Sequence, residues 1–183
     1  MRTNPKLAAV LATAALAIAG CGGSSPSGVS PAAYVKSVCG AATSWRNAIQ
    51  SAGTKLSAGV HTKSLTKAKA EYVAFVSSLV TATGQAESQL KSAGSPAVSN
   101  GKRIAGSLVR IFDAAKGTLV RAASQASALP TSSTGAFESS ASKVVTSIRS
   151  SLAGMSSVTP EKNAELHAAA SKDKTCQSLA GTA

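Results

Sequence analysis

Hydrophobic residues after position 30 recur in steps of three and four, which is the spacing of one face of an α-helix. The first series follows Ser30 and Pro31, a suitable N-cap and first helical residue, and Gly53 or Gly59 marks its end. Its apolar positions are Val35, Val38, Ala42, Trp45, Ile49, Ala52 and Leu56. The pattern predicts a first long helix that begins at Pro31.

Two more series of the same kind follow. The second stops at Gly94, and its apolar positions are Leu65, Ala68, Tyr72, Val76, Leu79, Thr83, Ala86 and Leu90. Ser95 and Pro96 are expected to open the third helix and Pro130 to stop it. Its apolar positions are Ile104, Leu108, Ile111, Ala115, Leu119, Ala122, Ala126 and Leu129. The sequence therefore predicts a second and a third long helix.

The C-terminal part of the chain predicts two more helices. The fourth begins near Thr134 and Gly135, and its inward positions are Phe137, Ala141, Val144, Ile148, Leu152 and Met155. A fifth, over about 160–180, follows the N-cap signal of Thr159 and Pro160. Its apolar face is thin and consists of Leu166, Ala169, Cys176 and Leu179, and Asp173 interrupts it.

Signals for β-strands are missing, because no alternating β-branched run and no Asn-Gly or Asp-Gly hairpin occurs between apolar stretches. Short connections between helices of similar length favour antiparallel neighbours. We therefore predict an all-α domain over residues 31–183, an up-and-down bundle of four long helices with a shorter C-terminal fifth helix. Its core should be slim, because Ala, Val, Leu and Ile dominate the inward positions. The six aromatic residues are expected in or beside this core: Tyr34, Trp45, Tyr72, Phe75, Phe112 and Phe137.

The first twenty residues follow a different pattern. Two basic residues, Arg2 and Lys6, precede the almost unbroken apolar run of residues 7–18. Counted on to Gly20, the run is about fourteen residues, which is shorter than the roughly 20 that a membrane-spanning helix needs, and it has the form of a secretory signal. We therefore expect residues 1–20 to be a signal peptide.

The tetrapeptide Ile18-Ala19-Gly20-Cys21 resembles the lipobox of bacterial lipoproteins. The abundance of Ala, Gly, Ser and Thr is similarly close to that of small exported lipoproteins of actinobacteria. The resemblance implies that a diacylglycerol is attached to Cys21, that the leader is cut before it, and that the protein is anchored on the outer face of the cytoplasmic membrane. Residues 21–30, rich in Gly, Ser and Pro, would be a flexible tether. An ordinary secretory signal with an incidental cysteine is the alternative.

Assigning Cys21 to a lipid leaves two cysteines, Cys39 and Cys176, near opposite ends of the exported domain. Outside the cytoplasm an even pair favours a disulfide, and closing so long a loop stabilises the fold by roughly 4–5 kcal/mol in the chain-entropy model. A Cys39–Cys176 bond would join the first and last helices. It requires the last helix to be offset or partly unravelled near its end, and two buried free thiols are the alternative.

The charge of the chain is strongly positive. Of 19 Lys and Arg, Arg2 and Lys6 lie in the leader, so 17 basic residues face 7 acidic ones and the exported part carries +10. Such a domain associates with anionic lipid headgroups or acidic wall polymers. Arg103, Arg110 and Arg121 fall within one narrow stripe of the third helix and are candidates for docking phosphate or carboxylate groups. A solvated helix face is the alternative.

The same residues make other kinds of chemistry improbable. His61 and His167 are far apart and belong to no metal-binding motif, and His167 faces away from Glu161 and Glu165 on a helix. No catalytic Ser motif or phosphate loop is present. Basic residues are not interleaved with aromatic ones, as nucleic-acid binding would require. We therefore expect neither an enzyme nor a cofactor, a metal or a nucleic-acid partner.

Two functions are consistent with these features. One is a membrane-anchored helical module that binds a specific partner or ligand in the cell envelope. The other is a structural or stress-related envelope protein that associates electrostatically with anionic lipid or wall polymer. A specific binder should have a sizeable apolar pocket with convergent polar groups, and an electrostatic one needs no pocket.

Replacing Cys21 tests the anchor. In Cys21→Ala no thiol is present to carry the diacylglycerol, so the protein should leave the membrane fraction and appear in the soluble fraction of lysed cells, measured by immunoblot. Cys39→Ala, which retains the lipobox, is the control and should stay with the membranes. A Cys21→Ala protein that lost its leader and still sedimented with membranes would contradict the lipid anchor.

Overall fold

The computed structural model describes residues 27–60, 62–156 and 163–181. Within these ranges every regular element is a helix and no β-strand occurs, so the all-α prediction is confirmed. The helices are α1 (Pro31–Gly59), α2 (Leu65–Ser92), α3 (Gly101–Ser127), α4 (Thr134–Ser156), α5 (Ala164–Lys172) and α6 (Lys174–Ala180). Cys21 and the lipobox lie outside the described residues.

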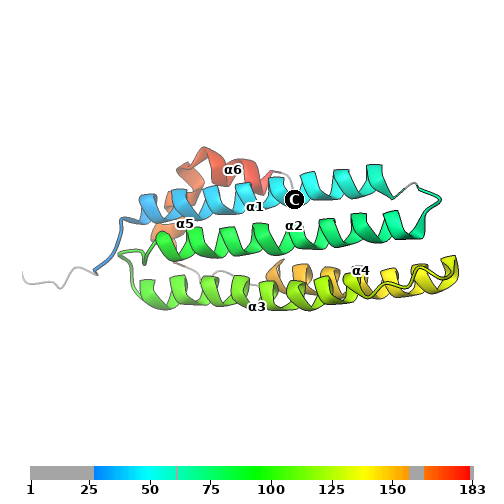
Figure 1. Ribbon diagram of the computed structural model, residues 1–183. Coiled ribbons are helices and arrows are strands. Elements are labelled where there is room, and N and C mark those ends of the chain that lie inside the picture. Colours follow the sequence, from blue (N-terminus) through cyan, green and yellow to red (C-terminus); the bar gives the residue numbers. More distant parts are fainter. Residues whose placement is uncertain (1–26, 61, 157–162, 182–183) are drawn as a thin grey trace, which may run out of the picture.

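Helices that follow one another in the chain pack on one another. α1 packs on α2, α2 on α3 and α3 on α4, whereas α5 and α6 pack on α1. Figure 1 shows α1, α2 and α3 side by side, with successive helices running in opposite directions. Among the residues that the structure describes, no helix is long and apolar enough to span a membrane.

The helices begin where short polar side chains can cap them. The Ser30 hydroxyl accepts a hydrogen bond from the Ala33 backbone N–H at 3.2 Å, and Pro31 follows as predicted. Ser64 accepts from the Lys67 N–H at 3.3 Å in the same way at the start of α2. Such caps satisfy backbone donors that would otherwise have no partner at a helix start.

The core is built largely from small side chains. Its main cluster draws on all four long helices: Ala52, Ala68, Val76, Leu79, Leu119, Ala122, Ala126, Leu129, Phe137, Ala141, Val144 and Ile148. The aromatic residues fill the gaps between these helices. The rings of Trp45 and Phe112 meet edge to face at 5.6 Å, and those of Tyr72 and Phe137 at 5.9 Å. The Trp45 indole N–H donates to the Thr83 hydroxyl at 3.1 Å, so Thr83 is fully buried without an unmet polar group.

The predicted start of the third helix was wrong. Ser95 and Pro96 do not open it; α3 begins at Gly101, after Asn100 in a left-handed conformation. The Val29 N–H instead donates to the Ser95 carbonyl at 2.9 Å, and the Ala97 N–H donates to the Val29 carbonyl at 2.7 Å. This pairing with the N-terminal segment keeps the stretch extended and buries Pro96. A Cβ at position 101 would lie 1.9 Å from the Pro96 carbonyl oxygen, so only glycine fits there.

The single fifth helix was also wrong, because Asp173 divides it into α5 and α6. The backbone of Asp173 is extended, and its carboxylate accepts a hydrogen bond from the Cys176 N–H at 3.0 Å. Asp173 therefore ends one helix and caps the next. At the other end, Asn163 caps α5 through the Leu166 N–H; the expected start at Thr159 and Pro160 lies outside the described residues.

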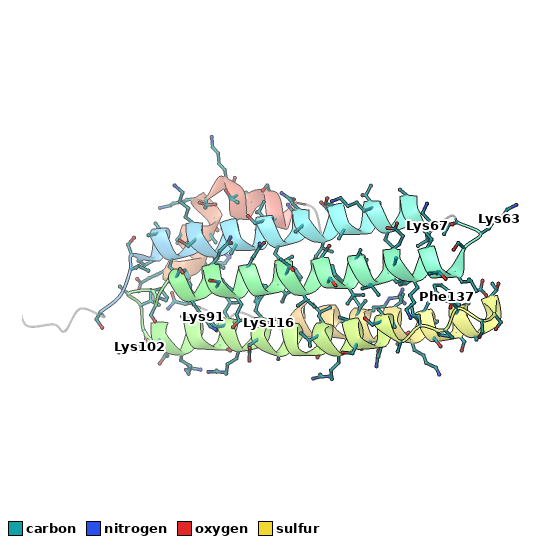
Figure 2. The ribbon with its side chains drawn as sticks, in the orientation of Figure 1. Lys63, Lys67, Lys91, Lys102, Lys116 and Phe137 are labelled. Carbon is teal, nitrogen blue, oxygen red and sulfur yellow. A yellow bond between two sulfur atoms is a disulfide. The ribbon has the colours of Figure 1, made fainter. Side chains whose placement is uncertain are left out.

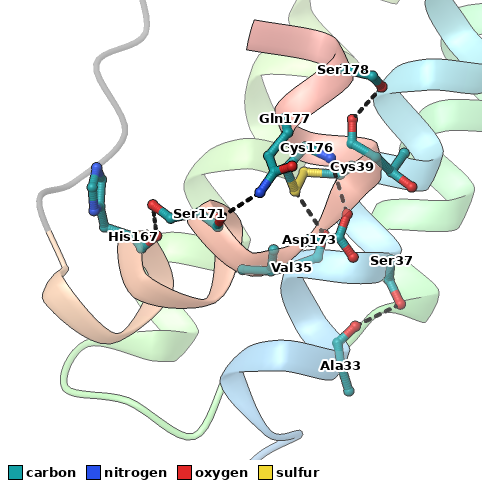
Figure 3. The surroundings of a disulfide bond; sticks show 11 residues. Ala33, Val35, Ser37, Cys39, His167, Ser171, Asp173, Cys176, Gln177 and Ser178 are labelled. Carbon is teal, nitrogen blue, oxygen red and sulfur yellow. Dashed lines mark hydrogen bonds between the residues drawn. A yellow bond between two sulfur atoms is a disulfide. The ribbon is translucent and has the colours of Figure 1, made fainter.

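The break at Asp173 explains how the predicted disulfide forms. α6 turns back along α1, and Cys176 meets Cys39 with their Cα atoms 5.2 Å apart (Figure 3). α5 contributes no fully buried residue, and α6 buries only Cys176. Leu166 packs beside Tyr34 and Ala105 as the one apolar contact of α5 with a core cluster. The disulfide therefore fastens to α1 two short helices that bury little surface of their own.

Removing the disulfide should release the C-terminal helices before it unfolds the domain. In Cys39→Ser/Cys176→Ser we expect amide hydrogens of α5 and α6 to exchange much faster, while those of α2 and α3 stay protected. Global stability should fall by about 2–5 kcal/mol. Hydrogen exchange followed by mass spectrometry measures the first effect, and denaturant unfolding the second.

Gly40→Ala is the matched control, since it alters the position next to Cys39, where an added Cβ meets nothing within 4 Å. Exchange in α5 and α6 should then stay slow. Equal protection of α5 and α6 with and without the disulfide would contradict their weak attachment.

Candidate functional site

The most strongly charged helix of the domain is α3. It carries five basic residues, Lys102, Arg103, Arg110, Lys116 and Arg121, and one acidic residue, Asp113. All except Lys116 are exposed. Figure 2 shows Lys102 at the N-terminal end of α3, close to the α2–α3 connection. This basic face of α3 is the candidate functional site.

The three arginines of the predicted stripe lie on the outer side of α3. At 100° per residue, Arg103, Arg110 and Arg121 fall within about 20° of one another around the helix axis. Phe112 and Leu119, which face the core, lie on the opposite side. At 1.5 Å per residue the stripe is about 27 Å long. The sequence therefore placed these side chains on a common exposed face, and the fold leaves that face uncovered by another described helix.

A short sequence repeat within α3 contains two of the three arginines, Arg110 and Arg121. Residues 106–110 read Gly-Ser-Leu-Val-Arg, and residues 117–121 read Gly-Thr-Leu-Val-Arg. The arginine of each copy folds back toward its own glycine. A Cβ at Gly106 would lie 3.5 Å from Arg110 Nη1, and a Cβ at Gly117 would lie 4.0 Å from Arg121 Nη1. Comparing the helix with itself at a spacing of eleven residues would have found the repeat.

In the second copy a hydroxyl group orients the arginine. Arg121 Nη2 donates to Thr118 Oγ1 at 2.9 Å, and this hydroxyl itself donates to the Ala114 carbonyl at 3.2 Å. Arg110 has no hydrogen-bond or ion-pair partner among the described residues. Neither guanidinium forms an ion pair with Asp113, which is the one carboxylate of α3. Both groups can therefore accept an external anion.

A buried carboxylate lies beside this face, between α2 and α3. Glu87 pairs with Lys91 on its own helix and with Lys116 on α3, each at 2.5 Å. Only 4% of the Glu87 side chain is exposed, against 60% for Lys91 and 36% for Lys116. The stem of Lys116 crosses Gly84 on its way to Glu87. The pair with Lys91 joins residues four apart on one helix, whereas the pair with Lys116 links two helices.

The ionisation of this cluster follows from its hydrogen bonds. The bonds from Lys116 and Lys91 lower the pKa of Glu87, which outweighs the opposite effect of burial. The bond to Glu87 in turn raises the pKa of Lys116. Glu87 is therefore ionised at neutral pH. Its position one helical turn after buried Thr83 was the signal that could have predicted its burial.

A hollow with a volume of about 860 Å³ lies between α1 and α2. It is a shallow groove open to solvent, and polar side chains provide much of its lining: Lys36, Ser37, Gln85, Ser88, Gln89 and Ser92. A smaller hollow of about 300 Å³ adjoins it at Gln85. Neither has the enclosed apolar lining with a few polar groups that is typical of small-molecule sites.

Of the residues considered for metal binding, the structure describes His167 and Glu165. His167 and Glu165 are both exposed on α5, while His61 and Glu161 lie outside the described residues. Within the described ranges, no group of three or more His, Cys, Asp and Glu side chains could hold a metal ion.

Comparison with known proteins identified no similar protein. No family model matches the chain, and no match was found among curated proteins or among solved structures. Any function must therefore be argued from the residues themselves.

Replacing Glu87 by glutamine tests the buried cluster. Glu87→Gln removes the charge that both lysines share, so the free energy of unfolding at pH 7 should fall by about 1–2 kcal/mol, the value of a charged hydrogen bond reduced for the exposure of the lysines. Because the pKa of Glu87 is lowered in the folded state, its contribution is present above the ordinary glutamate pKa. It is lost as the pH falls through the lowered value.

The stability difference between Glu87→Gln and the wild type should therefore shrink in acid, measured by urea unfolding between pH 7 and pH 3. Glu138→Gln changes an exposed glutamate of α4 and should alter stability little at any pH. A difference for Glu87→Gln that stays constant with pH would contradict the charged pairing.

Proposed function

We propose that this chain is an exported bacterial lipoprotein, anchored by lipid on Cys21 to the outer face of the cytoplasmic membrane. Its helical domain would hold anionic material of the cell envelope against its basic surface. In this proposal residues 1–20 are the signal peptide, residues 21–30 the tether and residues 31–183 the domain. The role is binding, without catalysis.

Between the two functions consistent with the sequence, the surface of the domain favours electrostatic association. A module for a specific small ligand would need an enclosed apolar pocket. The groove between α1 and α2 is instead open and rich in Ser and Gln. The observation that carries the proposal is the row of arginines on the outer side of α3, where Arg110 and Arg121 point away from the core without a carboxylate partner on their own helix.

The architecture that we infer for the domain is an up-and-down bundle in which α4 and α5 together occupy the position of a fourth helix. α4 contributes Phe137 and Ile148 to the same cluster as α1, α2 and α3. Near the other end of α1, Leu166 of α5 packs beside Tyr34 and Ala105. α4 would thus cover the inner faces of the first three helices near one end of the bundle, and α5 would cover them near the other end. The outer side of α3 would remain open.

Salt dependence tests the proposed function. The chain from residue 21 with Cys21→Ser lacks the lipid but retains the basic domain. At low salt it should cosediment with phosphatidylglycerol vesicles, or bind long-chain inorganic polyphosphate, and it should not bind phosphatidylcholine vesicles. Binding should weaken steeply between about 0.05 and 0.5 M salt, because screening shortens the reach of surface charges.

A neutral polymer such as dextran is the negative control. Failure to bind either anionic partner at low salt, or binding that does not change with salt, would contradict electrostatic association.

A further inference from the structure

We propose that the arginines on the outer side of α3 bind a linear, phosphate-bearing polymer laid along the helix. These residues, Arg103, Arg110 and Arg121, are called the arginine row below. The inference rests on the proposed function and assigns it a surface and a partner class. Its first observation is the repeat within α3, which is a separate observation from the net charge of the domain.

The arginine row is straight and parallel to the helix axis. The two copies of the repeat place Arg110 and Arg121 about 16 Å apart along α3, with a rotation of only about 20° between them. Arg103 extends the row by about 10 Å at the other end. A straight row of single cations fits an extended chain with regularly spaced anionic groups, because successive groups of one molecule can reach each cation.

Each copy of the repeat is arranged to present its arginine outward. The leucine at its centre faces the core: Leu119 is fully buried, and Leu108 packs against the cluster that contains Phe112. The glycine leaves space above the backbone, and the guanidinium lies over it. In the second copy the Thr118 hydroxyl holds the Arg121 guanidinium in place. Fixing the guanidinium before binding reduces the entropy that is lost when an anion docks.

The choice of side chain favours phosphate. The row consists of arginines, while the lysines of α3 lie to one side of it, at Lys102 and Lys116. A guanidinium offers two parallel N–H groups to two phosphate oxygens, whereas an ammonium acts as a point charge. Bidentate pairing at each arginine would make the row more selective than a general positive surface.

A membrane surface fits this face less well. Proteins that lie on bilayers place a row of large apolar side chains beside their basic residues. The large hydrophobic residues exposed in the described part are Val29 and Val120. Val120 lies about 80–100° around the helix from the arginines, and Val29 precedes α1. The arginine row has no apolar companion that could enter the lipid.

The test compares two double variants with the same loss of charge in the chain from residue 21 with Cys21→Ser. Arg110→Gln/Arg121→Gln alters the repeat, and Lys36→Gln/Lys143→Gln alters exposed cations of α1 and α4. For long-chain inorganic polyphosphate at fixed salt, we expect the arginine variant to lose about tenfold or more in affinity and the lysine variant less than about threefold. Circular dichroism and thermal unfolding establish that both variants fold.

Two further comparisons address the geometry and the chemistry. Triphosphate is too short to reach from Arg110 to Arg121, so it should bind the wild type far more weakly than the long chain and distinguish little between the variants. Arg110→Lys/Arg121→Lys keeps the charge but loses the bidentate fork, so polyphosphate affinity should fall between the wild type and the glutamine variant.

Several results would overturn the inference. They are equal losses in the two glutamine variants, unchanged affinity in the lysine-substituted arginine variant, or equally tight binding of a carboxylate polymer such as polygalacturonate. Binding to phosphatidylglycerol vesicles without binding to polyphosphate would reject the polymer and leave the proposed function standing. Binding to neither would reject both.

Discussion

The close approach of α2 and α3 is the constraint on which the rest of this domain depends. The residues where the two helices meet include Leu79, Leu119 and Ala122, each with at most 1% of its surface exposed. Alanine and a few medium side chains allow the backbones to come near, and the dispersion contacts of a dense interior then replace large apolar surfaces. The short distance also lets Lys116 reach across Gly84 to the carboxylate of Glu87. Packing and charge pairing at this interface therefore have the same origin.

A core of this kind leaves little apolar surface for peripheral elements. α5 and α6 offer Leu166 and the half-buried Leu179, and neither side chain is fully covered. Hydrophobic burial alone contributes in proportion to the area removed from water, so two short helices with so little buried area need another attachment. The Cys39–Cys176 bond supplies it by limiting the freedom of the unfolded chain. The disulfide therefore compensates for the small apolar area that α5 and α6 bury.

The sequence predicted what depends on periodicity and residue counting. The long helices followed from apolar spacing, and the disulfide from the even number of cysteines left after Cys21. The start of α3 did not follow, because Pro96 is held by Val29, more than sixty residues earlier in the chain. The split at Asp173 was signalled only as an interruption, since a capping aspartate and a helical one look alike in sequence. The burial of Glu87 did not follow either, because the lysine that pairs with it across the interface, Lys116, lies on a neighbouring helix.

The repeat in α3 connects the core to the candidate surface. Eleven residues make slightly more than three helical turns, so a duplicated segment returns every side chain to nearly the same direction. Leu108 and Leu119 then pack toward the core, while Arg110 and Arg121 lie on the outer face. Because all four residues are on one helix, a rotation that moved the leucines would also move the arginines. A basic residue placed for solubility alone would not need this register, since any exposed position would do.

The position of the N-terminal segment determines which end of the arginine row lies nearer to Cys21. Val29 pairs with the connection that leads into α3, so the chain enters the domain at the end where Lys102 and Arg103 lie. Between a lipid on Cys21 and residue 27, an extended chain spans at most about 20 Å. Arg121 lies about 27 Å farther along α3 than Arg103. If Cys21 carries the anchor, the arginine row begins close to the membrane and can extend away from it, toward a polymer rather than along the bilayer.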